Sequence, residues 1–155
     1  MPTQLIILLV SMIPVLELRG AIPVAVGVYN MPILDAFFWA VLGNIIPIVF
    51  ILLGLDLLIN KLLIHRIYFF NRFFTWLFER TQRNHSRKFE RWKELALVIL
   101  VAIPLPLTGA WTGALAAFVF GIPLKRAFPL IGLGVAIAGA IVTLITVGIM
   151  NLPFI

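Results

Sequence analysis

Hydrophobic positions along the chain gather into four long blocks, separated by short polar turns and one basic segment. The blocks cover about residues 5–28, 33–59, 95–120 and 127–149. A helix needs about 20 mostly apolar residues to cross a bilayer, and the second and fourth blocks meet this requirement. The pattern therefore predicts an all-α integral membrane protein.

The first and third blocks are each split near the middle by residues that stop helices. These residues are Pro14 and Gly20–Pro23 in the first block, and Pro104, Pro106, Gly109 and Gly113 in the third. Each block could cross the membrane once as a tilted helix. Alternatively, each could form a re-entrant hairpin, in which two half-length helices enter and leave by the same face around a buried break.

The basic residues favour the hairpins. If all four blocks crossed the membrane, the basic residues of 61–93 and of 125–126 would lie on opposite sides, against the positive-inside tendency. With two hairpins, both clusters lie in the cytoplasm and both termini lie outside.

The segment between the second and third blocks holds nine of the twelve Lys and Arg residues. Its first half mixes aromatic residues with arginines, which predicts an amphipathic helix in the membrane interface. A connector with cytoplasmic charges is one interpretation, and a site for anionic lipids is another. Nucleic acid is not expected as a partner, because basic clusters beside membrane segments typically mark the cytoplasmic face.

Two stretches of the chain share a layout that indicates an internal repeat. Each begins with Ile-Pro, continues through a small and polar break, and reaches an X-Pro turn before a long apolar block; Pro32 matches Pro123, and Gly43 matches Gly134. In the hairpin topology the repeats are inverted, which is a recurrent plan of secondary transporters. Ordinary packing of helices through small residues is the alternative.

The expected organisation is a single membrane domain. Repeat one covers residues 3–60, the amphipathic connector 61–94, and repeat two 95–151. Each repeat is a re-entrant helical hairpin followed by a transmembrane helix.

Composition strengthens the membrane assignment and removes several classes of chemistry. Of the 155 residues, 63% are hydrophobic and 12% are charged, whereas soluble domains average about 45–50% and 25%. The absence of Cys excludes disulfides, thiolate metal sites and Cys catalysis. Because no nucleotide-binding or hydrolase motif occurs, we expect no enzyme, no metal and no cofactor.

Glu17 and Arg19 are the outstanding candidates for function. A charge in the bilayer core costs at least about 2.5–3.5 kcal/mol, so each needs a partner or water. Two positions apart they would not face each other on a regular helix, but in a broken segment they can be neighbours. One interpretation is a structural ion pair at the hairpin tip.

In the functional interpretation, Glu17 gains and loses a proton, because burial disfavours the charged form of a carboxyl group. Arg19 then binds an anionic group such as phosphate through its planar fork of donors. Pro14, Gly20 and Pro23 would make the break around the pair.

The second break offers Thr108, Trp111 and Thr112 in place of charges. Hydroxyls and unwound carbonyls suit coordination of a cation or substrate, although the threonines could equally cap a helix. Asn44, in the second block, is expected to hydrogen-bond across helices and is a candidate for contact with the site.

The stretches ELRGAIPVAVG and IPLPLTGAWTGALAA, with the basic aromatic connector, resemble the small multi-drug export family of prokaryotic membrane proteins. The layout is also similar to that of the DedA superfamily. That resemblance implies two re-entrant hairpins in inverted repeats, and transport of lipids, including polyprenyl-phosphate carriers, with ion coupling. By matched position it points to Glu17, Arg19, Gly20 and Pro23 in the first hairpin, and to Pro104, Pro106, Thr108, Gly109 and Trp111 in the second.

These observations predict a small transporter or lipid translocase, coupled to a proton or sodium ion, in the plasma membrane of a prokaryote. Its substrate would be amphipathic, for example a lipid phosphate. The alternatives are a passive channel or lipid scramblase, and a structural membrane protein or assembly factor. Because two spans and two hairpins make a thin wall around a pathway, we expect a homo-oligomer, with a dimer favoured.

Overall fold

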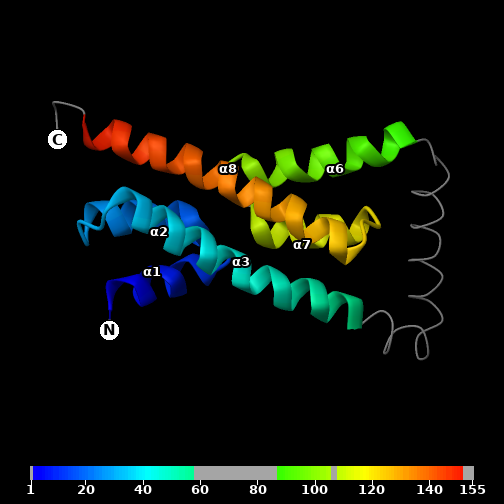
Figure 1. Ribbon diagram of the computed structural model, residues 1–155, viewed down its shortest axis with the longest axis horizontal. Coiled ribbons are helices and arrows are strands. Elements are labelled where there is room, and N and C mark those ends of the chain that lie inside the picture. Colours follow the sequence, from blue (N-terminus) through cyan, green and yellow to red (C-terminus); the bar gives the residue numbers. More distant parts are fainter. Residues whose placement is uncertain (1, 58–86, 106–107, 152–155) are drawn as a thin grey trace.

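The computed structural model describes residues 2–57, 87–105 and 108–151 (Figure 1). Within these ranges the chain forms six helices and no strand, so the all-α prediction is confirmed for them. The helices are α1 (Thr3–Met12), α2 (Glu17–Gly27), α3 (Ile33–Leu57), α6 (Arg87–Ala102), α7 (Ala110–Val119) and α8 (Leu124–Met150).

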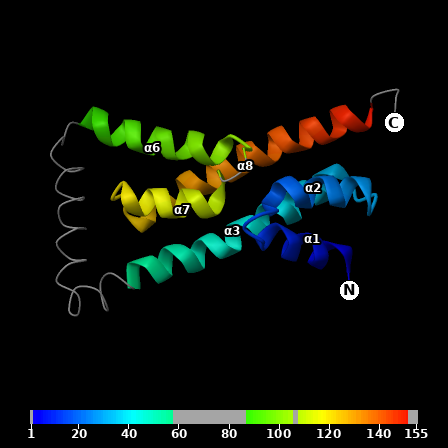
Figure 2. The same ribbon diagram turned by 180° about the vertical axis from the view of Figure 1, so that it is seen from behind.

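The two long helices, α3 and α8, run in opposite directions along the length of the molecule (Figures 1 and 2). The short helices α1 and α2 pair in one half of that length, and α6 and α7 pair in the other. Each pair turns back near the middle of the molecule. Both ends of the described chain therefore lie at one end of the molecule, opposite the end of α3 and the start of α6.

Both long helices meet the length and hydropathy of a membrane span. Among the described residues α3 has 25 residues with a mean hydropathy of 2.4, and α8 has 27 residues with a mean hydropathy of 2.5. The apolar helices α1 and α7 have 10 residues each. At about 1.5 Å per residue such a helix is about 15 Å long, which is half of a hydrocarbon core about 30 Å thick.

Prolines set where each short pair breaks. The residue before a proline is pushed out of the helical region, and Ile13, before Pro14, is extended with φ −73° and ψ 126°. In the second pair α6 ends at Ala102, just before the Ile103–Pro104 dipeptide. Pro106 lies outside the described residues.

Three residues predicted to form the breaks lie inside helices instead. Gly20 and Pro23 belong to α2, and Gly113 belongs to α7. The amide of Gly20 donates to the carbonyl of Leu16 at 2.9 Å, and the φ of proline is compatible with a helix, at the loss of one backbone hydrogen bond. Gly113 serves packing, because a Cβ there would overlap the side chain of Val101 in α6.

The matched glycines of the two repeats lie at similar helix crossings. A Cβ on Gly43 of α3 would lie 3.0 Å from the Cα of Leu8 in α1. A Cβ on Gly134 of α8 would lie 2.7 Å from Cβ of Val101 and 3.0 Å from the carbonyl oxygen of Val98 in α6. Leu8 and Val98 each stand five positions before an Ile-Pro pair. The first helix of each short pair therefore crosses its long helix at one of the two matched glycines.

Small residues let α2 and α7 fit against both long helices. Ala21 and Ala25 of α2, and Ala114 and Ala117 of α7, are fully buried. Helices in lipid associate by close packing of such residues, since lipid tails are as apolar as the side chains that they replace.

Most of the predicted amphipathic connector lies outside the described residues. Its last part, 87–94, is the beginning of α6, which continues without interruption into the apolar residues that follow. The helix therefore begins before residue 95, the start predicted for repeat two.

Candidate functional site

Glu17 begins α2 in an unusual backbone conformation. Its φ is +47°, in the left-handed region that costs a non-glycine residue about 1–3 kcal/mol. The amide of Glu17 donates to the carbonyl of Ile13 at 2.8 Å, and the residue is only 4% exposed. The turn at 13–16 thus places a carboxylate inside the molecule, against the second short pair.

The carboxylate of Glu17 caps helix α7. It accepts hydrogen bonds from the backbone N–H groups of Ala110 and Trp111, the first two residues of that helix. The first amides of a helix lack partners within it and form its positive end. The N-cap residue of α7 is Gly109, which offers no side-chain cap of its own.

Gly109 makes this approach possible. A Cβ on Gly109 would overlap the carboxylate of Glu17, and its φ of +146° is one that L side chains rarely adopt. Only glycine fits between the break and the acid.

Arg19 contacts the carbonyl side of the same break. Its Nη1 donates to the carbonyl of Leu105 and its Nη2 to the carbonyl of Thr108. Nη2 also lies 3.2 Å from Oγ1 of Thr108 and 3.8 Å from Oε2 of Glu17. The acid and the base are thus neighbours, as expected for a broken segment, and together they serve both the amides and the carbonyls that the second break leaves without helical partners.

The hydroxyl of Thr108 holds the break together from within. Its Oγ1 lies 2.7 Å from the carbonyl oxygen of Ile103 and 2.8 Å from that of Leu105. It also accepts from the amide of Leu105 at 3.1 Å. The hydroxyl of Thr108 and the carbonyl oxygens that accept from Arg19 form a small polar region around the guanidinium.

Three buried polar atoms have no hydrogen-bond partner in the part of the chain that the structure describes. They are Arg19 Nε, Asn44 Oδ1 and Trp111 Nε1. Such an atom costs about 1–3 kcal/mol, and native proteins usually satisfy it with a partner or water. Asn44 is 1% exposed, but its side-chain oxygen does not make the expected bond across helices to the described residues.

A groove lies between α2 and the C-terminal half of α8. Its volume is about 320 Å³, and Arg19, Pro23 and Gly27 contribute to its lining from α2. Ile145 and Ile149 face them from α8, and Arg19 is the one charged residue among those that line the groove. Pro104 contributes to the lining from the second break. Thr112 lies in α7 and does not belong to the lining.

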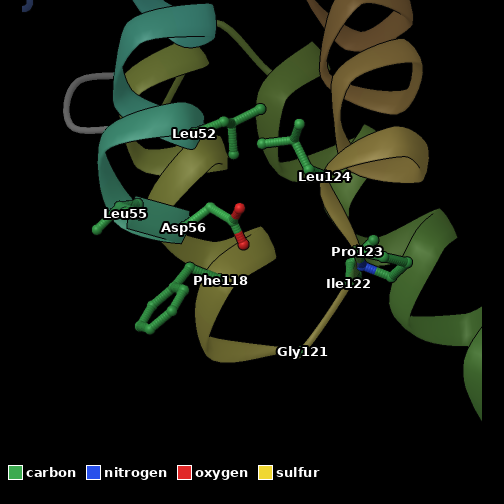
Figure 3. Close-up of a pocket in the computed structure, with 8 residues that line it drawn as sticks. All are labelled: Leu52, Leu55, Asp56, Phe118, Gly121, Ile122, Pro123 and Leu124. Atoms are coloured by element: carbon green, nitrogen blue, oxygen red, sulfur yellow. The ribbon is translucent and has the colours of Figure 1, made fainter. Parts of the chain in front are cut away.

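A second, smaller pocket of about 200 Å³ lies at the opposite end of the molecule. Figure 3 shows the carboxylate of Asp56 directed into the space between the end of α3 and the turn from α7 to α8, with Leu52 and Leu124 approaching from opposite sides. Neither cavity could be predicted from the sequence, because each is formed by helices that are far apart in the sequence.

A model of the family described as "Putative small multi-drug export protein" matches residues 17–141. The match includes the acid, the base, the second break and most of α8. No curated protein and no solved structure matches the chain.

Proposed function

Because the chain belongs to the small multi-drug export protein family, we propose that it is a small secondary transporter of an amphipathic anion, coupled to a proton or sodium ion. One observation carries this proposal. A buried acid and a partly buried base from the first short pair lie on opposite sides of the break in the second pair, next to an apolar groove.

The architecture supports a re-entrant, inverted-repeat transporter. Helices α1, α2 and α7 have 10, 11 and 10 residues, about half of a span, both short pairs break near the centre, and the long helices run in opposite directions (Figure 1). The crossings at Gly43 and Gly134 are similar. We place the two breaks at the bilayer midplane, where such transporters bind their substrates, and the basic connector in the cytoplasm of a prokaryotic cell.

Charge balance explains the coupling. Ionised Glu17 and Arg19 together carry no net charge, so an anion at Arg19 would leave an excess negative charge in the membrane. Burying an unpaired charge is costly, so the anion enters together with a proton on Glu17. Arg19 is the charged group that faces Glu17, because the described parts of α6, α7 and α8 around the site contribute no other. A sodium ion at the carboxylate, held by oxygens of the break, is the second candidate.

The existing bonds of Arg19 explain how binding moves the protein. Both terminal nitrogens of Arg19 are engaged by carbonyls of the second pair. A substrate headgroup that takes these donors releases α2 from the break between α6 and α7. Binding therefore changes how the two halves of the molecule are held together, as alternating access requires.

Uptake of an alkyl phosphate by liposomes that contain the purified protein tests the function. We expect an inward proton gradient to drive uptake, and Glu17→Gln to abolish the gradient-driven part and the pH dependence of binding. Arg19→Lys keeps the charge but loses the fork, so we expect weaker binding. If uptake by the wild type is independent of every ion gradient, the protein is instead a passive channel or scramblase.

An inert structural pair is the remaining alternative. Removing Arg19 alone leaves a buried carboxylate, at a cost of about 3–5 kcal/mol, whereas replacing both charges is often neutral or stabilising. The double variant Glu17→Gln/Arg19→Gln should therefore fold in either case. If it transports as well as the wild type, the pair has no role in transport and the proposal fails.

A further inference from the structure

The groove between α2 and α8 has a polar end and an apolar end. Arg19 lies near the start of α2, at the middle of the molecule, while Gly27 is the last residue of that helix. On α8 the lining continues to Met150, at the end of the molecule where both termini lie. Along α2 the distance from Arg19 to Gly27 is about 12 Å at 1.5 Å per residue.

The lining defines what the groove can hold. Apart from Arg19, it consists of proline, glycine, aliphatic residues, methionine and Thr146, whose hydroxyl already donates to the carbonyl of Val142 at 2.8 Å. The volume of about 320 Å³ is at the lower end of the range for ligand sites, about 300–1,000 Å³. A protein partner would need about 800 Å² of surface on each side, which a groove of this size does not offer.

We propose that this groove holds the hydrocarbon tail of an anionic membrane lipid, with the headgroup at Arg19 and the tail leaving past Gly27 into the bilayer. The inference rests on the proposed function, since it takes Arg19 to bind the anionic group. The groove spans less than half of a hydrocarbon core about 30 Å thick. It therefore encloses the part of the tail next to the headgroup, and the remainder stays among the other lipids.

Sideways entry follows from where the groove opens. Ile145 is 52% exposed, and Ile149 and Met150 are 49% exposed, so this face of α8 is accessible to lipid tails. Each buried methylene contributes about 0.8 kcal/mol, but only when it leaves water. Because a lipid tail is already in an apolar medium, the charge at Arg19 selects which lipid binds.

Gly27 controls the width of the exit. A Cβ at this position would meet no atom within 4 Å, so a large side chain can be accommodated without disturbing the helices, and it would fill the groove. Gly148 supplies a matched control. It lies on α8 near the same end, an added Cβ also meets open space there, and it does not belong to the lining.

Photo-crosslinking of the purified protein tests the groove. The probe is dodecyl phosphate with a diazirine in the middle of its chain, and peptide mass spectrometry locates the adducts. We expect adducts on α2 between Pro23 and Gly27 and on α8 between Val142 and Met150. Gly27→Phe should lower their yield by about fivefold or more, whereas Gly148→Phe should leave it unchanged.

Four results would contradict the binding of a lipid tail in this groove. Equal yields from Gly27→Phe and the wild type would show that the tail lies elsewhere. Equal labelling by a dodecanol diazirine would show that the headgroup at Arg19 plays no part in binding. Complete displacement of the probe by inorganic phosphate would show that the tail plays no part in binding. A change of oligomeric state in Gly27→Phe without loss of a lipid adduct would identify a second copy of the chain as the occupant.

The groove and the transport function can fail separately. If adducts form at the expected positions but transport does not depend on Glu17, the lipid-binding groove stands and the ion coupling is rejected. If transport depends on Glu17 but Gly27→Phe leaves the adducts unchanged, the proposed function stands and the binding of a lipid tail in this groove is rejected.

Discussion

At the scale of single residues, the site depends on a contact between two unusual backbone positions. Glu17 has a positive φ, and its carboxylate occupies the space that a side chain at Gly109 would need. The bonds to the amides of α7 offset the cost of the strained Glu17 backbone. Strain of this kind persists where surrounding structure determines it and often accompanies function.

Gly109→Ala tests this contact. The methyl group would push the carboxylate away from α7 and force a backbone conformation that costs about 1–3 kcal/mol. We expect a lower thermal unfolding temperature in detergent and loss of coupled transport.

Gly132→Ala is the control for this substitution, because a Cβ at that helical position meets no atom within 4 Å. Alanine there should be neutral or stabilising by up to about 1 kcal/mol. Unfolding temperatures that fall equally in both variants would contradict the contact.

At the scale of elements, each long helix is held by the first helix of a short pair through a close crossing. Gly43 brings α3 against the backbone of α1 at Leu8, and the buried hydroxyl of Ser11 in α1 donates to the carbonyl of Ala40 in α3. Gly134 plays the corresponding part between α8 and α6. These crossings fix the depth of each break relative to the long helices.

Gly43→Ala should separate α1 from α3. Adding a methyl group to a closely packed interface costs about 1–3 kcal/mol, and the backbone atoms of Leu8 cannot rotate away. We expect a clear fall in thermal stability, measured by fluorescence in detergent. Gly54→Ala lies on the same helix in open space; if it destabilised the protein as much, the effect would reflect the helix and not the crossing.

At the scale of the whole molecule, the arrangement gathers particular ends of the chain at the same end of the molecule. Both termini lie at one end, and the end of α3 and the start of α6 lie at the other (Figures 1 and 2). If the protein transports a substrate, as we propose, two long helices and two short pairs would make only a thin wall around the pathway. We therefore propose a homodimer in the membrane, with the lipid-facing grooves on the outside.

Labelling of single cysteines tests this topology, because the chain has no native Cys. Cysteines at Thr3, Tyr29 and Asn151 should react with an impermeant maleimide from one side, which we expect to be the outside. Cysteines at Arg87 and Lys125 should react from the other. If Tyr29 reacts from the side opposite to Thr3, the first block crosses the membrane, and the inverted-repeat transporter loses its main support.

The sequence by itself determined the elements and the positions of the prolines that interrupt them. The four apolar blocks and the breaks near Pro14 and Pro104 follow from local rules, because a proline restricts the residue before it and hydropathy sets the length of a span. The same reasoning failed at Gly20, Pro23 and Gly113, which lie inside helices. Whether a glycine ends a helix or permits close packing depends on its neighbours in space.

Only the tertiary structure decided what the charges contact. The sequence indicated that Glu17 and Arg19 could be neighbours, but not that they serve the amides and carbonyls of a break about 90 positions away. The groove next to Arg19 likewise requires α2 and α8 to pack together. Long-range contacts of this kind depend on how the helices cross, and one-dimensional patterns of apolar and polar residues carry no record of it.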